Sequence, residues 1–157
     1  MTPQSLARQD TPAAPTDVEG VADIEHLGRT DCLNLLALAQ VGRVGLIVHG
    51  QPEILPVNYA LDGDAILFRT AEGSVLNEAS MTNVAFEIDH IDEFTRSGWS
   101  VLVRGHATDI GSTIDATSER LRRLNLVTWA PGTRQRWFVI RPTTITGRRL
   151  EVLPLEL

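Results

Sequence analysis

The chain has 157 residues, of which 43% are hydrophobic, so it is long enough for one domain with a sizeable core. Its 14 basic and 20 acidic residues leave a net charge of −6, which argues against general binding to nucleic acid or to an anionic membrane. A single cysteine, Cys32, excludes an intrachain disulfide, and with no signal-like leader and no long apolar run we expect a cytoplasmic protein.

Residues 1–22 contain three prolines and show no hydrophobic periodicity, so we expect a flexible N-terminal tail there and one domain over residues 23–157. The segment from Thr30 to Gln40 predicts an amphipathic helix, because apolar residues recur at helical spacing in Cys32, Leu35, Leu36 and Ala39. We therefore expect the Cys32 side chain to lie in the core.

The rest of the chain is rich in strand patterns. Alternation and β-branched residues predict strands at residues 43–49, 53–61, 65–70, 83–89, 98–110, 136–141 and 144–152. Gly105 is expected to kink the fifth of these, and Pro142 to separate the last two. Two further helices are expected over residues 74–81 and 112–126. Because most connections are short, the pattern favours an antiparallel barrel or α+β layers.

The stretch from Pro56 to Leu76 carries most of the site signals. Asp62-Gly63-Asp64 between two apolar runs predicts a tight hairpin, since glycine tolerates positive φ. The second strand of that hairpin ends in Arg69-Thr70, and Gly73-Ser74 then opens a short helical pattern. A guanidinium and free N–H groups can hold an anion, so we expect this segment to bind the phosphate of a nucleotide-like cofactor.

Two aromatic segments complete the candidate site: Trp99-Ser100 at a strand start, and the loop from Trp129 to Gly132. Aromatic surfaces together with an anion clamp suit a planar ligand that carries a phosphate. Asn58 is a polar residue within an apolar strand, and it either serves the ligand or pairs with a neighbouring backbone group. The histidines are scattered, so no metal site is expected.

In their order along the chain, these segments resemble the pyridoxamine 5′-phosphate oxidase-like, FMN-binding split-barrel family, in particular its small actinobacterial-type members. The resemblance covers roughly residues 25–150 and rests on residues 41–45, 56–59, 68–70, 73–74, 98–101, 104–105, 129–132 and 146–148. It implies a mainly β fold, a six-stranded antiparallel split β-barrel. It also implies a homodimer with FMN at the interface, and an oxidoreductase that transfers a hydride through flavin N5 to or from a small-molecule substrate.

The resemblance further implies the residues that contact the cofactor: Pro56, Val57, Asn58, Tyr59, Arg69, Thr70, Ser74, Val75, Leu76, Trp99, Ser100 and Trp129. The chain departs from the family at Val75, where a lysine often adds a second positive charge beside the phosphate. That departure leaves two alternatives open: a reductase that uses a deazaflavin coenzyme, and a non-catalytic dimeric protein that binds or senses flavin. No side chain stands out as a catalytic acid or base.

Overall fold

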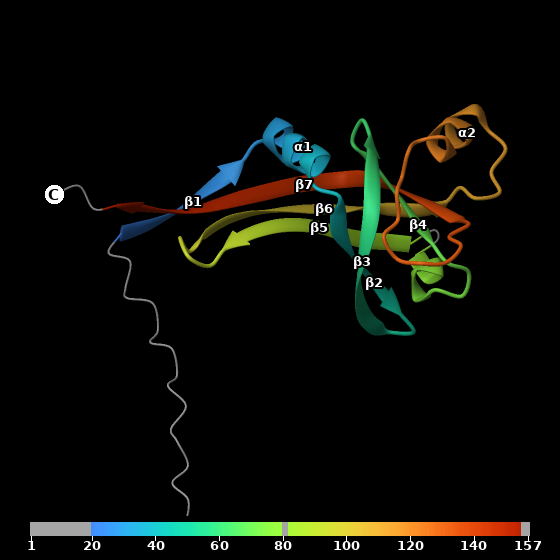
Figure 1. Cartoon of the computed structure of the whole chain (residues 1–157), viewed down its shortest axis with the longest axis horizontal. Helices are drawn as coiled ribbons and strands as arrows, with labels where there is room; N and C mark the ends of the chain where they lie inside the picture. The colour runs from blue at the N-terminus through green and yellow to red at the C-terminus, as the bar shows by residue number, and fades with distance from the viewer. Residues whose placement is uncertain (1–19, 80–81, 155–157) are drawn as a thin grey trace, which may run out of the picture.

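The computed structural model describes residues 20–79 and 82–154 of the chain. Seven strands dominate it, with two short α-helices and one 3₁₀ helix (Figure 1). In chain order the elements are β1 (Gly20–Leu27), α1 (Arg29–Leu38), β2 (Val41–Val48), β3 (Gln51–Asp62), β4 (Ala65–Thr70), η1 (Val75–Ala79), β5 (Thr82–Asp92), β6 (Ser97–Asp109), α2 (Ala116–Arg122) and β7 (Arg136–Pro154).

The strands form one antiparallel sheet in the order β1-β7-β4-β3-β2-β5-β6, which closes through a further pairing of β7 with β6. The long strand β7 makes this closure possible. Its first residues, 136–140, pair with β4, and residues 147–154 pair with β1. One end of the sheet is therefore a closed barrel, and the other end is an open layer of β5, β6, β7 and β1. This arrangement confirms the split barrel that was expected.

Pro142 does not divide β7 into two strands, which corrects the expectation from the sequence. The proline lies opposite Gly105, where the register of β6 and β7 shifts between Arg104 and Gly105. A Cβ on Gly105 would lie 2.4 Å from the carbonyl oxygen of Arg141, so only glycine fits at this crossing. The irregularity expected at Gly105 is thus present, and it accommodates the proline, which has no N–H to donate.

The main core fills the barrel interior, because alternate residues of the strands β2 to β7 point inward. It includes Phe68, Phe86 and Phe138, all fully buried. Helix α1 closes the core on one side and contributes Cys32, which confirms its expected core position. Gly147 of β7 lies directly beneath that helix.

A smaller outer core lies on the outside of the barrel, under α2. Its buried residues are Leu67, Ile110, Leu121, Leu126 and Val139. Helix α2 is shorter than the helix expected over residues 112–126, because Asp115 caps its start. The Asp115 backbone is extended, and its carboxylate accepts a hydrogen bond of 2.9 Å from the Ser118 N–H.

Strand β1 was not expected from the sequence. Its residues 22–26 are all exposed, so this edge strand has no buried face to produce an alternating pattern. Most of the tail expected over residues 1–22 lies outside the described residues, and β1 begins within its last three. The helix expected over residues 74–81 is a single 3₁₀ helix, η1, with residues 80–81 outside the description. None of the described helices is long and apolar enough to cross a membrane.

Candidate functional site

The hairpin between β3 and β4 has the tight turn that the sequence predicts. Asp62 pairs with Ala65, and Gly63 has a φ of +63°. Arg120 of α2 holds Asp62 through two hydrogen bonds of 2.7 and 2.6 Å, which ties the helix to the hairpin. These hydrogen bonds hold the pKa of the Asp62 carboxyl below its usual range.

Arg69 and Thr70 point to opposite faces of β4. The Thr70 side chain is buried with the main core, and its hydroxyl lies 2.8 Å from the Asn77 side chain. Arg69 instead points outward, on the same face as Leu67 of the outer core. Although Arg69 and Thr70 are neighbours in the sequence, their side chains therefore cannot both contact a ligand on one face of β4.

Arg69 is held on the outer face by two neighbours. Its guanidinium carbon lies 4.5 Å from the ring centroid of Trp137, the residue that pairs with it in β7. Its Nη2 donates a hydrogen bond of 2.5 Å to the Arg134 carbonyl. Its Nε is buried and has no hydrogen-bond partner in the described chain. A buried donor on a cation is rarely left unpaired, so this atom marks a position where an acceptor is missing.

On β3, the four expected contact residues divide between the two faces. Val57 and Tyr59 point into the main core, where the Tyr59 hydroxyl donates to the Leu36 carbonyl at 2.6 Å. Burial raises the pKa of Tyr59 well above its usual range. Pro56 and Asn58 lie on the outer face instead. Val57 and Tyr59 could reach a ligand on that face only through their backbone groups.

Asn58 lies one step beyond the last β3–β4 pair, Tyr59 with Phe68, and shares the outward face of the sheet with Arg69. We call Asn58, Arg69 and Trp137 the outer row. The Asn58 Oδ1 accepts a hydrogen bond of 2.8 Å from the Trp129 N–H, so the loop with Trp129 lies against this row. The fold thus brings together Asn58, Arg69 and Trp129, which are far apart in the sequence.

The turn after β4 satisfies most of its own polar groups. The Ser74 N–H donates to the Ala71 carbonyl at 3.2 Å, and the Ser74 hydroxyl accepts from the Leu76 N–H at 3.3 Å. Leu76 is buried in the main core, and Val75 is half-buried against it. Of the groups expected to bind the phosphate, Arg69 is the one left with an unpaired buried donor among the described residues.

Trp99 and Ser100 lie at the other end of the molecule. Arg69 pairs with Trp137 of β7, whereas Trp99 pairs with Arg149, twelve residues further along the same strand. At roughly 3.3 Å per residue that separation is about 40 Å along β7. One chain therefore does not bring Trp99 and Arg69 to the same small molecule.

Trp99 and Ser100 instead line a wide pocket on the open layer, and we call the sheet surface that lines this pocket the open-layer face. The volume of the pocket is about 1120 Å³, and its walls come from β1, β5, β6 and β7. The register sets its side chains in rows across the strands. One row is apolar (Ile91, Gly98, Leu150 and Ile24), and the next is polar (Asp89, Ser100, Arg148 and His26).

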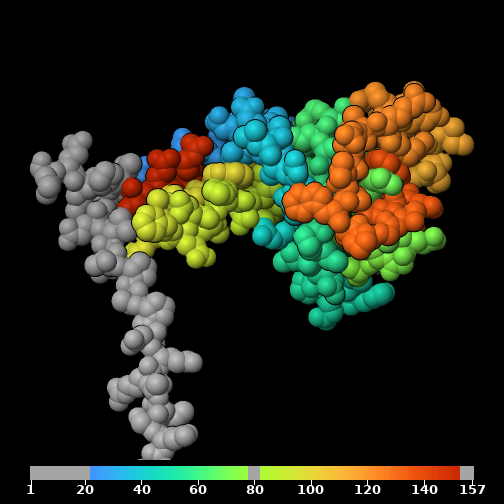
Figure 2. Space-filling view, in the orientation of Figure 1, coloured from blue at the N-terminus to red at the C-terminus, as the bar shows by residue number. Residues whose placement is uncertain are grey.

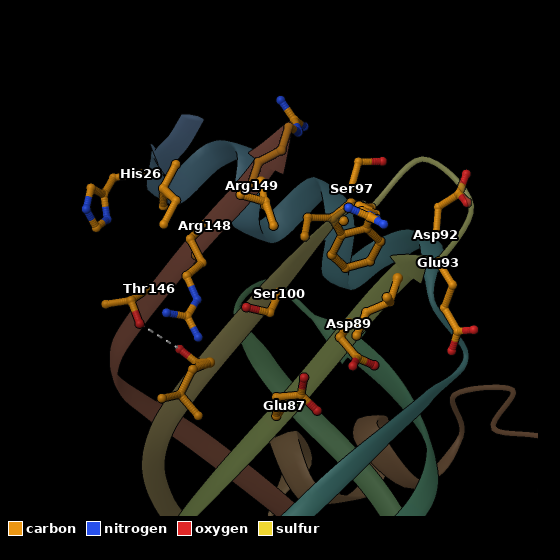
Figure 3. A pocket seen from close by; sticks show the side chains of 18 residues that line it. His26, Glu87, Asp89, Asp92, Glu93, Ser97, Ser100, Thr146, Arg148 and Arg149 are labelled. Atoms are coloured by element: carbon orange, nitrogen blue, oxygen red, sulfur yellow. Dashed lines mark hydrogen bonds between the residues drawn. The ribbon is translucent and has the colours of Figure 1, made fainter. Parts of the chain in front are cut away.

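Charge is divided across this pocket. Figure 3 shows Glu87, Asp89 and Glu93 on one side and His26 and Arg148 on the other. Arg43 of β2 donates to Glu87 and to Asp89, at 2.9 Å each, and these contacts raise the pKa of Arg43.

Comparison with known proteins agrees with this architecture. Residues 28–149 match the family model described as pyridoxamine 5′-phosphate oxidase. The chain belongs to this family. One curated relative is the uncharacterized protein Rv0080 of Mycobacterium tuberculosis. It is 31% identical to this chain over 138 residues, which cover 84% of this chain and 89% of Rv0080.

Two solved structures are also similar to this pyridoxamine 5′-phosphate oxidase family member. An FAD binding protein from Mycobacterium smegmatis is 34% identical with a TM-score of 0.62, over 81% of this chain and 98% of that one. An FAD-binding protein from Mesorhizobium loti has a TM-score of 0.66 at 20% identity, over 83% and 99% of the two chains, which shows the shared fold.

Several residues of the site are not evident from the sequence alone. Trp137, which supports Arg69, looks like an ordinary strand aromatic. The partition of Asp89 and Arg148 to opposite sides of one pocket depends on the pairing of β5, β6 and β7. The signal that could have found Trp137 is the alternation of β7, which puts it on the same outward face as Val139 of the outer core.

Proposed function

We propose that the protein binds FMN at the outer row and acts as a flavin-dependent oxidoreductase on a small-molecule substrate. Arg69 carries this proposal, because its buried Nε has no partner in the described chain while its guanidinium is fixed on Trp137. An anionic oxygen, such as that of a phosphate, would complete this donor set. The FAD binding protein from Mycobacterium smegmatis, at 34% identity, supports a flavin as the nucleotide.

The surroundings of the outer row also fit a planar ring. Trp129 is 66% exposed while its backbone N–H is held by Asn58, so its indole extends from an anchored backbone and is open to a ligand. Pro56 adds an exposed apolar surface on the same face. When bound, the flavin supplies hydride transfer through N5. The side chains of the protein hold the phosphate and the ring; among the described ones, none is assigned a proton-transfer role.

We also propose that the protein forms a homodimer. Trp99 and Ser100 are separated from Arg69 by about 40 Å along one strand, so they belong to a surface for a partner subunit and not to the flavin site around Arg69. The open-layer face has the features of the surface for that partner. Its apolar row exposes Ile24, Ile91 and Leu150 on one continuous sheet face.

Charge complementarity on the open-layer face favours a second copy over another partner. The polar row runs from Asp89 at one end to Arg148 and His26 at the other. A two-fold axis that passes through Ser100 would place Asp89 of one chain against Arg148 of the partner subunit, and the reverse. A surface that matches itself in this way is what an isologous dimer requires.

The test is an FMN titration of the purified protein, after its visible flavin band has been recorded. We expect Arg69→Gln to weaken FMN binding about tenfold to hundredfold, by loss of a charge-assisted contact to the phosphate. Binding of riboflavin, which has no phosphate, should change little. Arg104→Gln, which removes the same charge from an exposed position on β6, is the control. Wild-type protein that binds neither flavin would contradict the proposal.

A deazaflavin coenzyme is the second candidate, and Val75 is the observation that favours it. A half-buried valine that packs on the main core occupies the position where a second cation would serve the FMN phosphate. A parallel titration with FMN, FAD and a deazaflavin coenzyme separates these cofactors. Turnover of a nicotinamide donor would then distinguish the proposed enzyme from a protein that only binds flavin.

A further inference from the structure

The loop between α2 and β7, residues 123–135, lies over the barrel end of the sheet, and we call it the strap. Figure 2 shows it in orange beside the green of β3 and β4. At its start, Leu126 is buried in the outer core. Further along, two side chains of the sheet bind its backbone: Asn58 at Trp129, and Arg69 at Arg134. The strap is therefore held by two members of the outer row.

Both ends of the Asn58 amide are hydrogen-bonded to backbone groups. Its Oδ1 accepts from the Trp129 N–H at 2.8 Å, and its Nδ2 donates to the Gln40 carbonyl at 3.3 Å. Turning the amide over would set its NH₂ against a donor and its oxygen against a carbonyl, so these partners fix its orientation. Two of the four hydrogen-bonding positions of the amide are thus used by the protein backbone, one at each end.

We propose that Asn58 is a positioning residue, which acts on the ligand through Trp129. Its hydrogen bond to the Trp129 N–H holds the strap at the residue whose indole is exposed, and so sets how far that indole lies from the outer row. The inference rests on the proposed function, because the ligand against the wall is the flavin ring. It assigns to Asn58 control of ring affinity, whereas Arg69 controls the phosphate.

The hydrogen bond itself is tested without any ligand, by hydrogen exchange of the Trp129 N–H measured by mass spectrometry. Asn58→Val removes the acceptor and suits a strand, and we expect about fivefold to tenfold faster exchange at Trp129. Asn58→Asp keeps an oxygen acceptor for the Trp129 N–H but sets its other oxygen against the Gln40 carbonyl, so exchange should lie between the wild-type rate and that of Asn58→Val. If Asn58→Val lowers the thermal melting temperature strongly, Asn58→Ala takes its place. Unchanged exchange in these variants would overturn the proposal.

The ligand part is tested by equilibrium dialysis against riboflavin, which avoids the phosphate and any repulsion from the new carboxylate in Asn58→Asp. We expect Asn58→Val and Trp129→Ala each to weaken binding about tenfold, and the double variant to bind no more weakly than Trp129→Ala. Asn58→Asp keeps the acceptor for the Trp129 N–H and should lose less affinity than Asn58→Val. Additive losses would show that Asn58 contacts the ring itself and overturn the positioning role.

The two measurements fail independently. Wild-type protein that binds neither riboflavin nor FMN contradicts the proposed function and the ligand part of this inference with it. Even then, the exchange of the Trp129 N–H still decides whether Asn58 holds the strap. If the protein binds flavin but the exchange of the Trp129 N–H is unchanged in Asn58→Val, the proposed function stands and the role of Asn58 in holding the strap is excluded.

Discussion

Arg69 lies over the ring of Trp137, its strand partner, with the guanidinium carbon 4.5 Å from the ring centroid. The contact places a cation on the outside of the barrel and holds it there in a partly buried setting. A long flexible side chain loses rotamer freedom when it binds an anion, and a guanidinium already held on an aromatic ring loses less. Trp137 thereby prepares Arg69 for its proposed ligand.

Replacement of Trp137 should therefore weaken phosphate binding without any change in charge. We expect Trp137→Leu to lower FMN affinity about threefold to thirtyfold, the range for loss of a partly desolvated cation–π contact. Trp137→Phe keeps a ring and should lose less. Titration with FMN and with riboflavin checks this, because only the phosphate-bearing ligand should respond. An equal loss for both ligands would mean that Trp137 supports the ring site instead.

Val75→Lys adds a second cation at the turn after β4, and should increase FMN affinity about tenfold where the phosphate extends from Arg69 to this turn. Val75 is half-buried, so the lysine stem can pack on the main core while its ammonium reaches the surface. Val75→Met, of similar length and without charge, is the matched control. If the methionine variant gains as much as the lysine variant, or neither gains, the phosphate does not lie beside this turn.

Charge reversal on the open-layer face should disrupt and then restore the proposed homodimer. Asp89→Arg alone and Arg148→Asp alone each place like charges opposite one another across the two-fold axis, and should shift the protein towards monomer. The double variant should recover the dimer. Sedimentation equilibrium at several protein concentrations measures this. A wild-type monomer, or single variants that dimerise as wild type does, would point to a different occupant of this face.

Gly147→Ala should destabilise the fold, because its new Cβ would lie 2.6 Å from the buried Cys32 Sγ. Overpacking of this kind typically lowers the free energy of unfolding by about 1–3 kcal/mol. Cys32→Ala removes the sulfur, so the double variant should lose less than the sum of the two single variants. Urea denaturation of the four proteins measures the coupling. Strictly additive losses would show that Leu27, the other neighbour of Gly147, carries the clash.

The ion pair of Asp62 with Arg120 should contribute to the pH dependence of stability on the acid side. The hydrogen bonds from Arg120 lower the pKa of Asp62 in the folded protein. Its contribution is therefore fully present above the unfolded pKa of about 3.9, and is lost as the pH falls through the lower folded value. Asp62→Asn should flatten the fall of the urea midpoint below about pH 4. An unchanged profile would mean that this exposed pair is screened by solvent.

Much of the local structure follows from short-range sequence rules. The Asp-Gly turn, the amphipathic helix with Cys32 and the irregularity at Gly105 depend on neighbouring residues, and the structure confirms all three. Strand β1 and the continuity of β7 through Pro142 do not follow from neighbouring residues, because both depend on partners that are distant in the chain. A proline at a register shift needs no hydrogen-bond partner, and this cannot be read from its own segment.

The sequence by itself determined a mainly β fold and a tight hairpin, and it named the residues from which we propose a flavin site. Only the tertiary structure decided how those residues are divided. The period of β4 sends Thr70 into the core and Arg69 to the outer row, and the length of β7 separates Arg69 from Trp99 by about 40 Å. The physical reason is that strand pairing, which is non-local, sets which face each side chain occupies and which residues meet across the sheet.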